Sequence, residues 1–291
     1  MRIGIHTSRA GSLERAALKA VELGANTFQI FSSSPRMWRA SQPVQAEIEA
    51  LRKVRERFDL KPLVVHVNYL VNLASVDPVI RPKSVAAFRG ELERADAIGA
   101  EYLVLHPGSY RNQALDEGIA ALAMGLKEAA EGMEPRTMVL LENTVGCGQQ
   151  IGCRFAELRH IRDLAAELTP LRLGYCLDTC HLLAAGFDVA REGGLCSTVR
   201  EADAVLGLSN VKVIHANDSK TPLGSRVDRH QHIGEGFIGK AGFRRILAHP
   251  GLHDKAFILE TPVDVEGDDR RNMEALKKLC PKSRTTTKKS N

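Results

Sequence analysis

Residues 24–31 read Gly-Ala-Asn-Thr-Phe-Gln-Ile-Phe, and residues 99–106 repeat the phrase as Gly-Ala-Glu-Tyr-Leu-Val-Leu-His. Each phrase follows a segment with apolar residues at three- and four-residue intervals, a spacing typical of an amphipathic helix that ends at glycine. The apolar run after each glycine is short, as in a buried strand. The two phrases therefore indicate a repeated unit of one helix and one strand.

Short apolar runs of this kind occur eight times along the chain. We expect strands at residues 3–6, 27–31, 63–67, 102–106, 138–142, 173–178, 211–215 and 257–260. Helical periodicity between the runs predicts crossover helices, for example at residues 12–23, 44–58, 84–98 and 155–168. Successive strand ends lie about 36 residues apart on average, which suits a strand, a loop, a helix and a second loop.

This alternation predicts an α/β protein with a single (β/α)₈ TIM barrel over residues 1–280. An open doubly wound sheet is the alternative architecture. It is less favoured because no glycine-rich dinucleotide-binding turn follows the first expected strand. No linker or break in composition divides the 291 residues into two domains.

The composition is that of a globular protein, with 44% hydrophobic and 26% charged residues. No apolar run reaches about 18 residues, so the sequence predicts neither a membrane span nor a signal peptide. We expect a soluble intracellular protein, cytoplasmic and associated with the nucleoid if its source is a bacterium.

The formal net charge of +5 is unevenly distributed, because the last ten residues carry four basic side chains and no acidic one. Residues 281–291 are also rich in Ser, Thr and Lys. This composition predicts a basic, disordered C-terminal tail that lies near a polyanion or only aids solubility.

Six cysteines are scattered along the chain, and we expect no disulfide in a protein of this size and compartment. Two pairs are close in sequence, Cys147 with Cys153 and Cys176 with Cys180. Neither pair has the spacing of a zinc knuckle, so we interpret all four as packing residues rather than metal ligands.

The third to the eighth expected strands each carry an imidazole or a carboxylate at or next to the carboxyl end, namely His66, His106, Glu142, Asp178, His215 and Glu260. One such residue is more often a packed core side chain than a ligand. Six together are costly to bury unless cations offset them. In a barrel the strand ends share one mouth, where active sites lie.

Three further residues can join this set from adjoining loops: His181, Asp228 and His230. In an extended chain, Asp228 and His230 point to the same face, as chelation of one ion requires. Imidazole nitrogens and carboxylate oxygens without thiolates suit zinc or manganese at a catalytic site. Nine ligands are too many for one tetrahedral ion.

Three phrases of the sequence carry a resemblance to a known family. They are Leu-Glu-Asn-Thr-Val-Gly at 141–146, Cys-Leu-Asp-Thr-Cys-His at 176–181, and the run from Asn217 to Gly236. Together with the nine possible ligands, they resemble endonuclease IV, the zinc-dependent abasic-site endonucleases of AP endonuclease family 2. The resemblance extends from about Ile3 to Met273, and the tail from Pro281 lies outside it.

The resemblance implies three zinc ions per chain, with manganese possible at some sites. Glu142 and Glu260 would serve catalysis as well as metal binding. The first ion would be held by His66, His106 and Glu142, the second by Glu142, Asp178, His215 and Glu260, and the third by His181, Asp228 and His230. Three residues match family positions that insert into the duplex: Arg36, Tyr69 and Leu70.

The implied reaction is hydrolysis of the phosphodiester on the 5′ side of an abasic site in double-stranded DNA. It would leave a 3′ hydroxyl and a 5′-deoxyribose phosphate, and the same site would remove groups that block 3′ ends. Zinc would supply an activated water, neutralise the phosphate charge and stabilise the leaving oxygen. The partner would be DNA rather than a membrane, and we expect a monomer.

Two alternatives fit the residues less well. A metal-dependent sugar isomerase or epimerase needs one or two ions, which leaves Asp228 and His230 unexplained. A DNA-damage binding module without catalysis would be expected to have lost ligands, and all nine are present.

Overall fold

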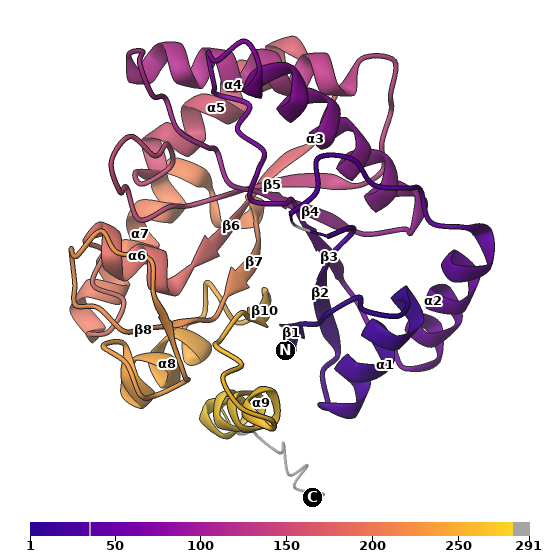
Figure 1. The fold of residues 1–291 in the computed structure, drawn as a ribbon. Helices are drawn as coiled ribbons and strands as arrows, with labels where there is room; N and C mark the ends of the chain where they lie inside the picture. The colour runs from indigo at the N-terminus through magenta and orange to yellow at the C-terminus, as the bar shows by residue number, and fades with distance from the viewer. Residues whose placement is uncertain (35, 282–291) are drawn as a thin grey trace, which may run out of the picture.

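The computed structural model describes residues 1–34 and 36–281, and the expected tail from residue 282 onward lies outside the described residues. Eight parallel strands close into a barrel in the order β1-β10-β7-β6-β5-β4-β3-β2, as Figure 1 shows end-on. They are β1 Arg2–His6, β2 Thr27–Phe31, β3 Leu63–His66, β4 Tyr102–Leu105, β5 Met138–Glu142, β6 Leu173–Asp178, β7 Val211–His215 and β10 Ala256–Leu259. The predicted TIM barrel is confirmed.

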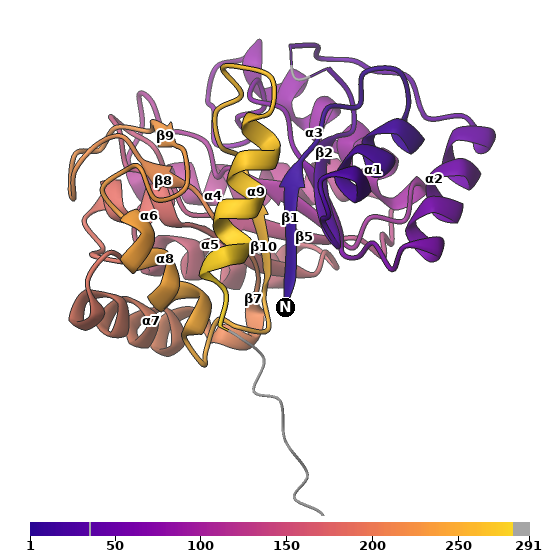
Figure 2. The same ribbon diagram turned by 90° about the horizontal axis from the view of Figure 1, so that it is seen from below.

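Helices surround the barrel (Figure 1), and a two-stranded antiparallel hairpin, β8 Asp218–Ser219 with β9 His230–Gln231, lies toward one of its ends (Figure 2). The helices are α1 Leu13–Glu22, α2 Gln45–Arg57, α3 Ile80–Ala97, α4 Leu115–Ala130, α5 Phe155–Leu168, α6 Thr179–Ala185, α7 Glu192–Leu206, α8 Gly239–Ala248 and α9 Asp268–Leu279. A 3₁₀ helix, Leu208–Asn210, precedes β7.

Every expected strand lies within one residue of its observed limits, but α3 begins four residues before the expected position. The Asp77 carboxylate accepts the backbone N–H groups of Val79 and Ile80 at 2.8 and 2.9 Å, so it caps the start of the helix. Pro82 is tolerated because it lies in the first turn, where no N–H is needed for a helical bond.

Side chains alternate between the inside and the outside of the barrel along each strand, as the strand geometry requires. The inner cluster consists of Val64, Val104, Leu140, Cys176, Val213, Ala256 and Ile258. Intervening residues such as Val65 and Leu141 belong instead to the larger core between strands and helices. The barrel is therefore filled, and it closes the floor beneath its C-terminal mouth.

Figure 2 shows the barrel from the side, with the arrowhead of β1 and the β8–β9 hairpin at one end and the N-terminus at the other. The carboxyl ends of the strands thus face the hairpin. Among the described residues, the structure contains no helix long and apolar enough to span a bilayer.

Candidate metal centre

Each of the six possible ligands at the strand ends lies two residues after a member of the inner cluster. Because a strand repeats its facing every second residue, a residue two positions after an inward one also points into the barrel. The pairs are Val64 with His66, Val104 with His106, Leu140 with Glu142, Cys176 with Asp178, Val213 with His215, and Ile258 with Glu260. The strand period thus brings all six side chains together above the apolar floor.

Glu142 lies at the centre of these side chains and is fully buried. Its Oε2 atom is 3.2 Å from Nε2 of His66 and 3.0 Å from Nε2 of His106, and its Oε1 atom is 2.8 Å from Nδ1 of His215. Burial alone would raise the pKa of Glu142, but the imidazoles of His215 and His106 hold this pKa well below its usual range. The group is therefore an ionised carboxylate with imidazoles facing both of its oxygens.

Glu142 belongs to three groups of possible ligands whose donor atoms lie within 4.8 Å of one another, and two of these groups contain no thiol. The first group is His66, His106 and Glu142, and the second is Glu142, Asp178, His215 and Glu260. These are the two sets that the resemblance implied, and the shared carboxylate can bridge two cations.

The third set is also brought together, with one addition. Nε2 of His181 is 3.2 Å from Oδ2 of Asp228, and Nε2 of His230 is 3.4 Å from Oδ1 of the same carboxylate. Asp178 joins both imidazoles in a group with a 4.8 Å span, and its Oδ2 is 3.7 Å from Nε2 of His230. Asp178 therefore faces the second and the third group, which the sequence did not predict.

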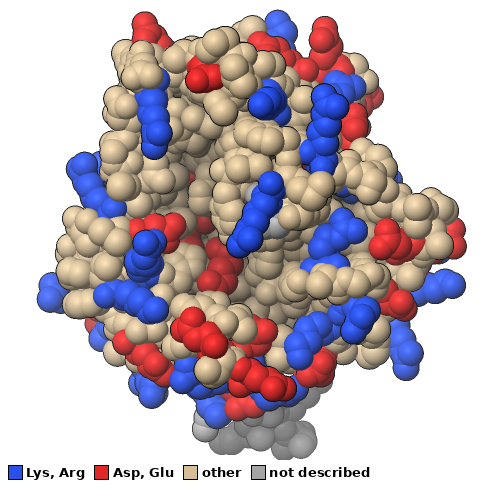
Figure 3. Space-filling view, in the orientation of Figure 1, with Lys and Arg blue, Asp and Glu red and all other residues tan. Residues whose placement is uncertain are grey.

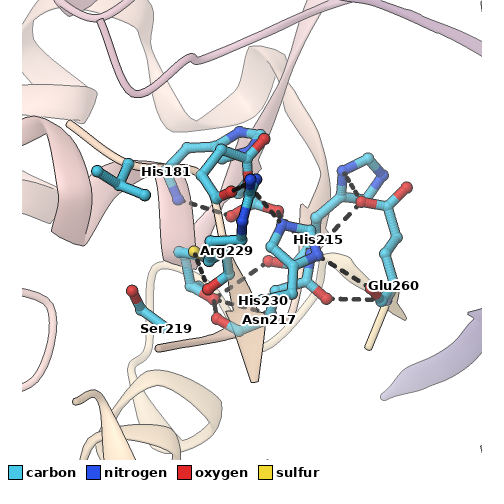
Figure 4. A network of polar contacts seen from close by, with 12 residues as sticks. His181, His215, Asn217, Ser219, Arg229, His230 and Glu260 are labelled. Carbon is cyan, nitrogen blue, oxygen red and sulfur yellow. Dashed lines mark hydrogen bonds and ion pairs between the residues drawn. The ribbon is translucent and has the colours of Figure 1, made fainter. Parts of the chain in front are cut away.

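Three of the imidazoles are oriented by backbone carbonyls that accept a hydrogen bond from Nδ1–H. The pairs are His66 with Val67 at 2.7 Å, His181 with Asn143 at 2.9 Å, and His230 with Glu260 at 2.9 Å. Figure 4 shows His181 and His230 in the polar network at the mouth of the barrel, where both rings face the Asp228 carboxylate. In each ring Nε2 is therefore the nitrogen that can bind a metal, because metal-ligating histidines commonly donate the other N–H to such an outer partner.

The residues present fit metal ions on one further observation. Nε2 of His181 and Nε2 of His230 are buried, and neither has a hydrogen-bond partner among the described residues. Buried polar atoms normally have partners. Each nitrogen lies within ion-pair distance of the Asp228 carboxylate but lacks a hydrogen bond, so a cation is suited to be the missing partner.

Two buried cysteines, Cys176 and Cys180, also lie within reach of these groups. Burial raises the pKa of both thiols to about 12, so both are uncharged in the metal-free chain at neutral pH. Their burial agrees with the interpretation of these two as packing residues, which stays a prediction.

The other cysteine pair requires a correction. Cys153 is partly buried, but Cys147 is exposed, so its interpretation as a packing residue is wrong. Neither residue belongs to a group of possible metal ligands among the described residues.

The amides that connect the ligands were not predicted from the sequence. Gln29 is fully buried, and its Oε1 accepts a hydrogen bond from Nε2 of His215 at 2.8 Å while its Nε2 donates to Glu260. Asn217 donates to Oδ2 of Asp178 at 2.6 Å and accepts the backbone N–H of Glu260 at 2.8 Å (Figure 4). The signal for Gln29 was a polar residue inside the apolar run of β2.

The segment that follows β9 is held against β8 by the buried carboxylate of Asp218. That carboxylate accepts five backbone N–H groups, from Ser219, Gly234, Gly236, Ile238 and Gly239, at 2.9 to 3.2 Å. A side chain at Gly236 would place its Cβ 2.5 Å from Oδ1 of Asp218, so only glycine allows this approach. The segment is thereby closed against β8.

The mouth of the barrel is hollow and contains acidic side chains, with Lys and Arg on the surrounding surface (Figure 3). A cavity of about 300 Å³ lies over the ligand groups, a second of about 470 Å³ lies beside it, and Tyr69 lines both. Tyr69 is 71% exposed and packs edge-on against Phe31, with ring centroids 5.3 Å apart. Leu70 is half-buried and Arg36 is exposed.

Comparison with known proteins places this arrangement in a family. The family described as xylose isomerase-like TIM barrel matches residues 17–279. The probable endonuclease 4 of Solibacter usitatus is 66% identical over 96% of this chain and 97% of that protein. The chain belongs to the endonuclease IV family. The crystal structure of endonuclease IV from Thermus thermophilus agrees, with a TM-score of 0.83 and 40% identity over 96% of this chain and 98% of that one.

Membership in the endonuclease IV family confirms the predicted class of enzyme, a nuclease, and with it the assignment to DNA repair. A D-tagatose 3-epimerase-like protein also shares the barrel, with a TM-score of 0.70 and coverage of 96% of this chain and 97% of that one. At 22% identity this likeness shows the fold alone. The ligand groups are consistent with the use of metal ions in this family.

Proposed function

We propose that the chain hydrolyses the phosphodiester on the 5′ side of an abasic site in double-stranded DNA, using three zinc ions. The observation that carries this proposal is the convergence of nine imidazoles and carboxylates into three overlapping groups at the barrel mouth. The products would be a 3′ hydroxyl and a 5′-deoxyribose phosphate. The same site would remove groups that block 3′ ends.

The chain's own residues would prepare this site in two ways. Glu142 presents one oxygen to the His66 side and the other to the His215 side, so a single charge holds two groups together. Gln29 and Asn217 connect Glu260 to His215 and Asp178, which restricts the movement of these ligands. Glu142 and Glu260 would thus act on the reacting phosphate through the metal ions that they hold.

Zinc bound to these residues would lower the pKa of a coordinated water and offset the charge that develops on the phosphate oxygens. Manganese at some of the sites would supply similar chemistry. Nitrogen and oxygen ligands without thiolates suit both ions.

Recognition of the lesion would fall to Arg36, Tyr69 and Leu70, of which Tyr69 lines both cavities at the mouth. An abasic site has no base edge to read, so the enzyme must detect a gap in the stack. Tyr69 offers an exposed aromatic face next to the His66 ligand, at 6.3 Å between ring centroids. We further propose that the enzyme acts as a monomer in the cytoplasm, at the nucleoid if its source is a bacterium.

The function is tested with a duplex that contains one reduced abasic site, which cannot undergo lyase chemistry. Incubation with the pure holoenzyme should give a single cut, and mapping of the product ends should show a 3′ hydroxyl next to the lesion. A cut on the 3′ side, or no cut with zinc present, would contradict the proposal.

We expect about three zinc ions per chain, because nine ligands at three or four per ion fill three sites when Glu142 is shared. Elemental analysis of protein purified without chelators should give this ratio. A value of one or less would exclude the three-zinc arrangement.

Zinc binding should release protons at pH 7. Burial would lower the pKa of His181, but Asp178 and then Asp228 and Glu142 raise it to about 10 in the metal-free chain. At pH 7 this imidazole is therefore doubly protonated, and zinc must displace the proton on Nε2. Zinc binding should release at least about one proton per chain. The pKa of His181 is higher in the folded, metal-free chain than in the unfolded chain, so protonation of His181 stabilises the fold. This stabilisation is complete at a pH below the pKa of the unfolded chain, and it is lost as the pH rises through about 10.

Calorimetric titration of the metal-free protein with zinc in buffers of different ionisation enthalpy measures this release. The apparent heat should vary with the buffer at pH 7. A heat that does not depend on the buffer would show that His181 is neutral or does not bind zinc.

A further inference from the structure

The two segments that carry the proposed lesion-contacting residues meet at a buried polar cluster that includes two side chains of α3. The β2 segment comprises residues 32–34 and 36–38, and the β3 segment comprises residues 67–72. The linking cluster consists of Ser32, Ser33, Asn68, Glu91 and Arg94, whose exposed fractions lie between 1% and 6%. None of these residues belongs to the ligand groups of the metal centre.

Glu91 is the hub of the linking cluster. Its Oε1 atom accepts hydrogen bonds from Ser33 Oγ and Asn68 Nδ2, each at 3.3 Å, and its Oε2 accepts one from Ser32 Oγ. Arg94 compensates the charge, with Nη2 3.2 Å from Oε1 of Glu91, and its Nε donates to Ser32 Oγ at 2.8 Å. One carboxylate on α3 is thus bonded to both segments.

Asn68 joins the two segments directly. Its Nδ2 also contacts the carbonyl oxygen of Met37 at 3.5 Å, next to Arg36, and its Oδ1 accepts the backbone N–H of Leu70 at 3.0 Å. The edge-on packing of Tyr69 against Phe31, the last residue of β2, adds a third connection. The positions of the β2 and β3 segments are therefore set relative to one another by the linking cluster.

We propose that Glu91 is a positioning residue for lesion recognition, which holds the segments of Arg36 and of Tyr69 and Leu70 in one arrangement before DNA binds. This inference rests on the proposed function. A preformed arrangement lowers the entropic cost of ordering these side chains when DNA binds. The benefit is limited to the binding of abasic DNA, because an intact duplex offers no gap to fill.

The test is Glu91→Gln, which keeps the size of the side chain but replaces one accepting oxygen with an amide that cannot accept. Steady-state cleavage of an abasic duplex gives KM and kcat, and competition by an intact duplex of the same sequence gives Ki. We expect KM to rise about fivefold, with kcat within threefold and Ki and zinc content unchanged. Loss of folded enzyme alone would instead lower kcat and leave KM unchanged.

Asn68→Ala removes the direct link without disturbing the Glu91–Arg94 pair, and it serves as the second variant if Glu91→Gln folds poorly. The same rise in KM is expected. Asp96→Asn is the matched control, because Asp96 lies on the same helix and accepts the backbone N–H of Arg136 at 2.7 Å, just before β5 at the opposite end of the barrel. It should leave KM and Ki unchanged.

An unchanged KM in the folded variants would overturn the inference, as would equal rises in KM and Ki, or a rise of the same size in Asp96→Asn. All three outcomes leave the proposed function intact. Failure of the parent enzyme to cut the abasic duplex would instead remove the proposed function on which the inference rests.

Discussion

Glu142→Gln should reduce cleavage of abasic DNA by more than about 100-fold while the protein stays folded. Loss of an outer partner of a metal ligand costs 10–100-fold in metal affinity or activity. Glu142 is proposed as a direct ligand shared by two ions, so the loss should exceed that range. An amide keeps the shape of the carboxylate but has one weakly accepting oxygen and no charge to set against His66, His106 and His215.

Single-turnover cleavage measures the effect, with circular dichroism for the fold and elemental analysis for zinc. Glu101→Gln is a matched control, because Glu101 precedes β4 at the other end of the barrel, where it accepts the backbone N–H of Leu63 at 2.7 Å. It should cleave at the parent rate. Near-normal turnover in Glu142→Gln would remove Glu142 from the mechanism.

The sequence predicted the fold and the ligands for the same physical reason. Strands with a period of two carry an inward residue at or next to the carboxyl end, and in β3, β4, β5, β6, β7 and β10 that residue is His, Asp or Glu. The residue type and its inward direction could therefore both be predicted from the sequence, as for His66, two residues after Val64. The sequence predicted less well which ligands share an ion. The short distance between Asp178 and His230, for example, depends on how the loop after β8 folds back.

Residues that act through hydrogen bonds could not be found in this way. Gln29 occupies an inward position on β2, but an amide there is equally compatible with ordinary packing until His215 and Glu260 are seen beside it. Asp218 accepts only backbone N–H groups, and Glu91 binds side chains from two other segments. Neither residue forms a pattern in the sequence, because each partner is brought near by the tertiary fold.

Replacing both Tyr69 and Leu70 with Ala should weaken binding of abasic duplex about tenfold or more and leave the metal centre unchanged. Stacking of an aromatic side chain on a base is worth about 1–3 kcal/mol, and 1.4 kcal/mol corresponds to a factor of ten. Tyr69 is free to stack because it is 71% exposed, and its edge-on packing against Phe31 fixes its direction near His66. Zinc content should not change, and a simple aryl phosphodiester, which has no base stack to open, should be hydrolysed at the parent rate. Phe58→Ala truncates an exposed aromatic at the end of α2, away from the mouth, and should have no effect on either substrate. Equal losses for abasic DNA and the small diester would mean that Tyr69 and Leu70 only pack beside the ligands, and their proposed role in recognising the lesion would have to be abandoned.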